Sequence, residues 1–384
     1  MVERPSMTTG GASAAEPQRL KISPERRLLL CMGPGGVGKT TVSAALGLAA
    51  ARGGRKVVVV TIDPSRRLAQ ALGLDAGLGH APGAIVPVTG IEGVSLDCLL
   101  LDTKQVFDDL VHAYSPSPAQ AAAMLANPIY RATAQHLSGA VEYAATARVH
   151  MLHEAGEHDL IVLDTPPTAN AIDFLDAGPT IQEVIANPAA RLLAGTGRVG
   201  MKFLGLGRGL LLRTLETVAG GSFLSQLGAF LGDFSLVLKE FQRRAGDVAA
   251  LLQSPETGTV VTTAPTLFSR READTFIDEI VRRQMPMEAI IVNRALPAPT
   301  SPLAQSELVE AVAAGGTADV SEVVAAATDL FEGATRQATA AVETAAHLRG
   351  RYPGVPVCVL PRRSPPPTSL EELLAMGTEL YTRE

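Results

Sequence analysis

Cysteine is scarce in this sequence, which has only three among its 384 residues. Cys31, Cys98 and Cys358 lie far apart and form no CxxC pair, so neither a disulfide framework nor a four-cysteine zinc site is expected. We interpret all three as small packing residues. Long runs of Lys or Arg are missing too, and the formal net charge is -6. This acidic balance argues against nonspecific binding to nucleic acid.

Long hydrophobic segments are missing as well. The least charged stretch, 217–232, is shorter than the roughly 20 residues that a membrane-spanning helix needs. Residues 1–25 are small and polar and lack the apolar segment of a secretory signal, so we predict a disordered tail there. These absences indicate a cytoplasmic protein and leave peripheral contact with a membrane open. Apolar residues make up 46% of the chain, enough for a hydrophobic core in a domain over 26–384.

Short apolar runs alternate with helix-like segments along this domain. Such alternation predicts an α/β fold, with a mainly parallel sheet that is covered by helices on both faces. Strands are predicted at 27–32, 56–62, 96–101, 160–163, 259–263, 289–292 and 355–360, and helices at 38–52, 270–283 and 321–348. A more polar helical region, 108–155, precedes the fourth strand. No strand is expected over 179–254, which we interpret as a helical insertion subdomain.

Six apolar side chains of this insertion recur at three- and four-residue steps, which places them on one helical face. They are Phe223, Leu227, Phe230, Phe234, Leu238 and Phe241. The stripe is suited to packing against the other helices or a second subunit. It is equally the kind of surface that lines a groove for a hydrophobic client helix. The segment 201–208 mixes glycine, apolar and basic residues, and is interpreted as a mobile loop, an interfacial membrane element or part of that groove.

A glycine-rich loop at 33–40 carries the clearest signal. It fits the pattern G-x-x-x-x-G-K-[ST] at every fixed position and lies between a predicted strand and a predicted helix. Backbone N–H groups of such a loop turn toward phosphate oxygens, and the helix N-terminus adds its positive end. Lys39 is expected to reach the β- and γ-phosphates, and Thr40 to place its hydroxyl on Mg²⁺. The predicted nucleotide contacts are Gly35, Gly36, Val37, Gly38, Lys39, Thr40 and Thr41, and the predicted ligand is ATP with Mg²⁺.

Two acidic residues follow strands of the predicted sheet, at the edge where α/β proteins build their ligand sites. Asp164 suits a Walker B role and is predicted to hold Mg²⁺ together with Thr40. Asp63 is predicted to act in catalysis with Lys39, by orienting the attacking water beside the γ-phosphate. The alternative for each carboxylate is a structural role, capping a helix from a loop.

These motifs together resemble the ArsA-type ATPases, which include the arsenite-pump ATPase and the targeting factor for tail-anchored membrane proteins. The family loop is GKGGVGKTT, and the resemblance extends from about residue 27 to about 380. It implies that Asp63-Pro64-Ser65 is switch I and Asp164-Thr165-Pro166-Pro167-Thr168 is switch II. It also implies that Asn293 recognises adenine, with Pro361 and Arg362 near the base. The family fold is a P-loop NTPase with a helical subdomain after switch II.

The sequence departs from this family at three places. Pro34 stands where the family has a second lysine that reaches the phosphates of the other subunit. Three explanations remain open: this subunit contributes nothing in trans, Arg66 or Arg67 supplies the charge, or a paralogous partner keeps the lysine. The zinc-binding CxxC of the eukaryotic targeting factor is absent. The insertion contains no cysteine, so arsenite handling is not expected, because soft arsenite needs thiolates.

The main functional prediction is an ATP-hydrolysing, ArsA-like ATPase. The resemblance implies a nucleotide-driven dimer, either a homodimer or a heterodimer with a paralogous subunit, acting on a partner or a hydrophobic protein or membrane client. One alternative is a nucleotide-binding regulatory subunit with little turnover of its own, paired with an active paralogue. Another is a ParA-like partition ATPase, which shares the loop but is usually shorter and carries a basic DNA-binding surface.

Overall fold

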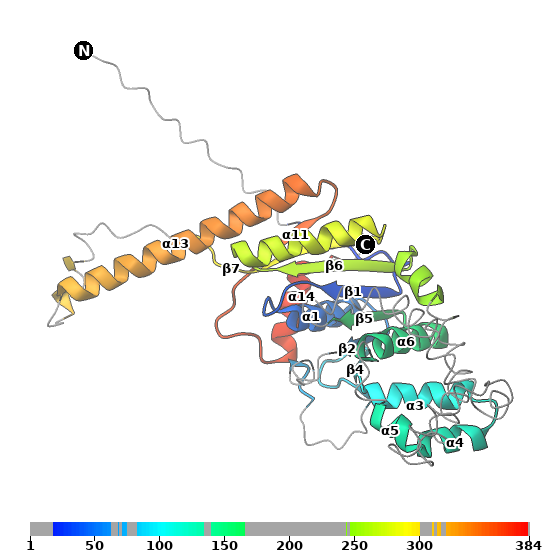
Figure 1. Ribbon diagram of the computed structural model, residues 1–384. Helices are drawn as coiled ribbons and strands as arrows, with labels where there is room; N and C mark the ends of the chain where they lie inside the picture. Colours follow the sequence, from blue (N-terminus) through cyan, green and yellow to red (C-terminus); the bar gives the residue numbers. More distant parts are fainter. Residues whose placement is uncertain are drawn as a thin grey trace, which may run out of the picture.

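An eight-stranded sheet forms the centre of the computed structural model, which describes residues 18–62, 68, 71–74, 83–133, 140–165, 243, 246–299, 309–310, 313–315 and 320–382. The strand order is β3-β4-β2-β5-β1-β6-β7-β8. Helices cover both faces of the sheet (Figure 1). The predicted α/β class is therefore confirmed. The predicted insertion and its apolar stripe lie outside the described residues, except for 243 and 246–254, of which 246–253 are helical.

The strands agree with those predicted, with ends shifted by a few residues. The seven parallel strands are β1 (Leu28–Met32), β2 (Val57–Thr61), β4 (Leu96–Leu100), β5 (Leu160–Asp164), β6 (Thr257–Thr263), β7 (Met287–Ala295) and β8 (Val357–Pro361). One short strand, β3 (Ile85–Pro87), pairs antiparallel with β4 at an edge and was not predicted. It buries only its middle side chain, so its sequence carries little apolar pattern.

Two separate hydrophobic cores lie on the two faces of the sheet. In β1, Leu28 and Leu30 belong to the core formed with α6 (Ala140–Ala155), α11 (Leu267–Arg282) and α13 (Val320–Arg351). Leu29 and Cys31 belong to the other core, formed with α1 (Lys39–Arg52) and α14 (Leu370–Leu380). Both faces of β1 are buried, which is why its sequence is apolar without interruption.

Helix α14 packs directly on α1. Gly377 allows the two backbones to approach, because a Cβ at this position would lie 2.1 Å from the carbonyl oxygen of Ala45. A capping box between Ser369 and Glu372 begins α14. The glycine-rich loop leads directly into α1, so the packing of α14 on α1 helps to hold the helix that follows the loop.

The predicted helical region before β5 is confirmed as four helices. They are α3 (Thr103–Tyr114), α4 (Pro118–Ala126), α5 (Pro128–Thr133) and α6. Asp102 and Ser117 cap the first two, each accepting a hydrogen bond from a backbone N–H of the first turn. Among the described helices, none is long and apolar enough to cross a membrane.

The tail predicted over 1–25 needs a correction for its last residues. Leu20 and Ile22 are buried. The Leu20 N–H donates to the Leu380 carbonyl at 2.7 Å, and the Thr382 N–H donates to the Leu20 carbonyl at 3.0 Å. Two apolar side chains in alternation are enough to fix this short segment beside the end of α14, although its composition resembles that of a tail. Residues 1–17 lie outside the described part.

Candidate active site

The glycine-rich loop joins β1 to α1 at the carboxyl edge of the sheet, with β5 and β6 on either side of β1. This is the place where an open α/β sheet binds its ligands. Gly33 begins the loop with a φ of 140°. A Cβ there would lie 2.0 Å from the Thr262 carbonyl oxygen at the end of β6, so only glycine fits. Gly35 and Gly36 are exposed, whereas Thr40 and Thr41 are half-buried.

Lys39 is buried and folds back over the start of the loop. Its Nζ donates to the carbonyl oxygens of Gly33 at 2.7 Å and of Pro34 at 2.8 Å. An ammonium group that is held by neutral carbonyls has a weaker attraction there than it would have for phosphate. The side chain therefore lies where an anion above the loop can recruit it.

Asp164 ends β5 and is only 1% exposed. Its carboxylate accepts hydrogen bonds from the hydroxyls of Thr61 at 3.0 Å and Ser43 at 3.3 Å. Burial raises the pKa of Asp164, while the hydroxyls of Thr40, Thr61 and Ser43 and the charge of Lys39 counteract part of that rise. Residues from β2, β5 and α1 thus converge on one carboxylate.

The oxygen donors at this point suit a hard cation. Mg²⁺ prefers oxygen ligands and is usually bound through one or two carboxylates, with phosphates and water completing its shell. Asp164 and the Thr40 hydroxyl are of this kind and lie within one hydrogen-bonded cluster. No group of three or more His, Cys, Asp or Glu side chains that could hold a metal by itself occurs in the described ranges. The residues therefore fit a metal that a bound phosphate helps to hold.

Asn293 reaches the loop from the end of β7. Its Nδ2 donates to the Val37 carbonyl at 2.8 Å, across 256 residues of sequence. Its Oδ1 accepts from the N–H of Arg294 at 2.9 Å. Directly after the neighbouring strand β8, Arg362 donates its N–H to the Ala295 carbonyl at 2.8 Å. The three residues predicted near adenine therefore lie at the ends of two adjacent strands, β7 and β8: Asn293, Pro361 and Arg362. Of these, Asn293 contacts the loop.

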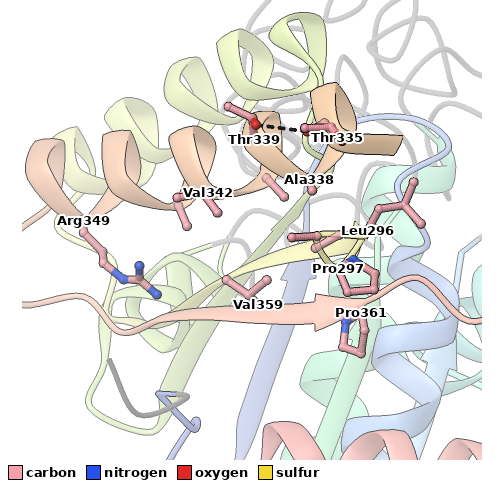
Figure 2. Close-up of a pocket in the computed structure, with 13 residues that line it drawn as sticks. Leu296, Pro297, Thr335, Ala338, Thr339, Val342, Arg349, Val359 and Pro361 are labelled. Carbon is pink, nitrogen blue, oxygen red and sulfur yellow. Dashed lines mark hydrogen bonds between the residues drawn. The ribbon is translucent and has the colours of Figure 1, made fainter. Parts of the chain in front are cut away.

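An apolar groove of about 580 Å³ adjoins these strand ends, between α13 and β8. Figure 2 shows Val342 of the helix and Val359 of the strand on its two walls. Leu296, Pro297 and Pro361 gather at one end of it, and Arg349 lies at the other (Figure 2). Pro361, which is predicted to lie near the base, is thus one of the residues that line the groove.

Several predicted residues lie outside the described part of the chain: Asp63, Arg66, Arg67 and residues 166–168. Thr165 is described, and both its N–H and its hydroxyl donate to the Cys31 carbonyl, at 3.2 and 2.9 Å. Two hydroxyl residues of the Asp164 cluster, Ser43 and Thr61, were not predicted. Ser43 lies one helical turn after Lys39 and Thr61 ends the second strand, which is the positional signal that could have found them.

Strand order, loop geometry and the Asp164 cluster define the P-loop nucleoside triphosphatase fold. A family model described as "Anion-transporting ATPase" matches residues 26–314. The chain belongs to that family, and the predicted ArsA-like resemblance is confirmed.

Individual relatives share between a quarter and a third of their residues with this chain over the aligned regions. The protein SCO2128 of Streptomyces coelicolor is 33% identical over 162 residues, which cover 41% of this chain and 39% of that protein. The ATPase GET3 of Mycosarcoma maydis is 25% identical over 288 residues, 74% of this chain and 77% of the relative. The ATPase BagA of Mycobacterium tuberculosis is 28% identical over 194 residues, 46% of this chain and 52% of the relative. The chain thus spans about two fifths to three quarters of these proteins.

Proposed function

We propose that this chain binds ATP with Mg²⁺ at the loop 33–40 and hydrolyses it. The observation that supports this best is that Lys39, Thr40 and Asp164 lie together beside the glycine-rich loop. The backbone of this loop also requires glycine at position 33. Family membership supports the same reaction.

Each residue has a distinct role in this proposal. Lys39 exchanges the carbonyls of Gly33 and Pro34 for the β- and γ-phosphates, and the backbone N–H groups of the loop bind the same oxygens. Thr40 and Asp164 hold Mg²⁺, which would neutralise charge that develops on the phosphates. Asp63 orients the attacking water. The residue before it, Ile62, donates its N–H to the Asp164 carbonyl, which ties this part of the chain to the site.

Pro34 leaves this subunit without the second lysine of the family. Its carbonyl accepts from Lys39, and its ring provides neither charge nor N–H for a phosphate. As the resemblance to the ArsA-type ATPases implies, we propose a dimer that switches with nucleotide and is formed with a second copy or with a paralogous ATPase. The insertion 179–254, within the domain 26–384, would transmit the change to a partner or a hydrophobic client. The alternative that Pro34 favours is a regulatory subunit that binds ATP with little turnover.

Phosphate release from Mg²⁺–ATP tests the reaction. Wild-type protein should release phosphate, and Lys39→Ala should not. The matched control is Lys104→Ala, which removes an exposed lysine that pairs with Asp108 on α3 and should change nothing. Nucleotide binding, measured by calorimetry, separates the alternatives. Binding without any Lys39-dependent release would favour the regulatory subunit, and absence of both would overturn the nucleotide site.

A further inference from the structure

The side-chain amide of Asn293 is bonded within the protein at both ends. Its Nδ2 donates to Val37 of the phosphate loop, and its Oδ1 accepts from the backbone of Arg294. The side chain is buried, with 7% of its surface exposed. A residue that acted only on a bound base would not need these internal bonds.

The surrounding backbone is built for this contact. Gly38 has a φ of 91°, and a Cβ on it would lie 2.6 Å from Asn293 Nδ2, so the amide approaches the loop more closely than any other residue at 38 would permit. Arg294 adopts a φ of 61°, a left-handed conformation that costs a non-glycine residue roughly 1 kcal/mol. The β7–β8 register shifts between Val292 and Ala295, on either side of this turn.

The Val37 carbonyl and the Gly38 N–H belong to one peptide group. Because that group is planar and trans, its C=O and N–H point in opposite directions. Fixing the carbonyl toward Asn293 therefore fixes the Gly38 N–H away from β7. In a phosphate loop, that N–H is one of the donors that a polyphosphate requires.

We propose that Asn293 is a positioning residue for the phosphate loop, which orients the Val37–Gly38 peptide and so contributes to binding any polyphosphate, whatever its base. The proposal rests on the nucleotide site proposed above. It goes beyond the recognition of adenine, because it assigns Asn293 an effect on ligands that have no base. An amide keeps one further N–H and one further lone pair, so this role leaves room for contact with a base as well.

Magnesium tripolyphosphate is the probe that distinguishes the two roles. In Asn293→Leu, an uncharged side chain with the same number of non-hydrogen atoms cannot donate to Val37, and in Asn293→Ala the amide is removed altogether. Each variant should bind both tripolyphosphate and ATP about tenfold more weakly, the factor expected for the loss of one hydrogen bond. Unchanged tripolyphosphate affinity in both variants would overturn the proposal and leave Asn293 as a reader of the base.

Thr275→Ala in α11 is the matched control. It removes one neutral hydrogen bond, from the exposed Thr275 hydroxyl to the Arg271 carbonyl at 3.1 Å, at a residue outside the proposed site, so tripolyphosphate binding should stay unchanged. If this control weakens tripolyphosphate binding as much as Asn293→Leu does, the effect is not specific to the Val37 contact and the proposal fails.

Amide hydrogen exchange of residues 33–40 without ligand supplies a second readout. Exchange should be faster in Asn293→Leu than in the wild type, while the melting temperature of the protein stays within a few degrees. Equal exchange rates would contradict the proposed role. A wild type that binds neither tripolyphosphate nor ATP would overturn the nucleotide site instead, and the ligand-free exchange would still decide the role of Asn293.

Discussion

Replacing Gly377 by alanine should destabilise the protein, although alanine is the better helix former. In a helix interior, Gly→Ala is worth about 1 kcal/mol of added stability. At Gly377, however, the new Cβ would lie 2.1 Å from the Ala45 carbonyl oxygen and 2.9 Å from the Ala49 Cβ. No side-chain rotation relieves contact with a backbone atom, so α14 must move away from α1 by about 1 Å to restore ordinary van der Waals distances.

Overpacking of this kind typically costs about 1–3 kcal/mol, and more where backbone must shift. Because the clash is with backbone, we expect a cost at the upper end, about 3 kcal/mol, which the gain in helix propensity reduces to a net loss of about 2 kcal/mol in the free energy of unfolding. Urea unfolding followed by circular dichroism measures it. The matched control is Gly350→Ala in α13, where a Cβ meets no atom within 4 Å and a gain of about 0.5 kcal/mol is expected. A Gly377→Ala protein as stable as the wild type would refute the packing argument.

Three further predictions concern buried or paired groups. The Thr259 hydroxyl is buried and has no hydrogen-bond partner in the described part of the chain, so Thr259→Val should raise the free energy of unfolding by about 1 kcal/mol; a lower urea midpoint would contradict this. Burial raises the pKa of the three cysteine thiols to about 11 or 12, so a disulfide reagent at pH 8 should label none in the native protein and all three in denaturant. Arg282 and Arg283 lower the pKa of Glu279 from 4.5 to about 2, so the stability that this carboxylate contributes is complete above pH 4.5 and is lost as the pH falls toward 2. Glu279→Gln should therefore lower stability by up to about 1 kcal/mol at pH 7 and have no effect near pH 2, as pH-dependent urea midpoints would show.

The parallel sheet could be predicted because its strands are buried on both faces, which makes each of them a continuous apolar run. Helix α14 was not predicted, although its capping box at Ser369 and Glu372 is a local signal that precedes an apolar pattern. Strand β3 was not predictable in the same way. It is three residues long and gains its order from pairing with β4, which no local pattern records.

In the candidate site, too, the residues of a local motif could be predicted, whereas contacts between distant parts of the chain could not. The loop motif fixes Gly33, Lys39 and Thr40 within eight residues, and the sequence therefore identified them directly. The bond between Asn293 and Val37 joins residues 256 apart and depends on β6 separating β1 from β7, which only the folded sheet defines.

Because the sheet separates two hydrophobic cores, neighbouring residues of β1 pack against different helices. Leu30 packs in the core with α11 and α13, whereas Leu29 packs in the core with α1 and α14. In genetic terms, a second-site suppressor of a defect at Leu29 is to be sought in α1 or α14, and one for Leu30 in α11 or α13. Substitutions in α1 or α14 would also affect the position of the phosphate loop, because α1 begins directly after it. A destabilising substitution at Leu29 should therefore lower nucleotide affinity, and its suppressor should restore that affinity.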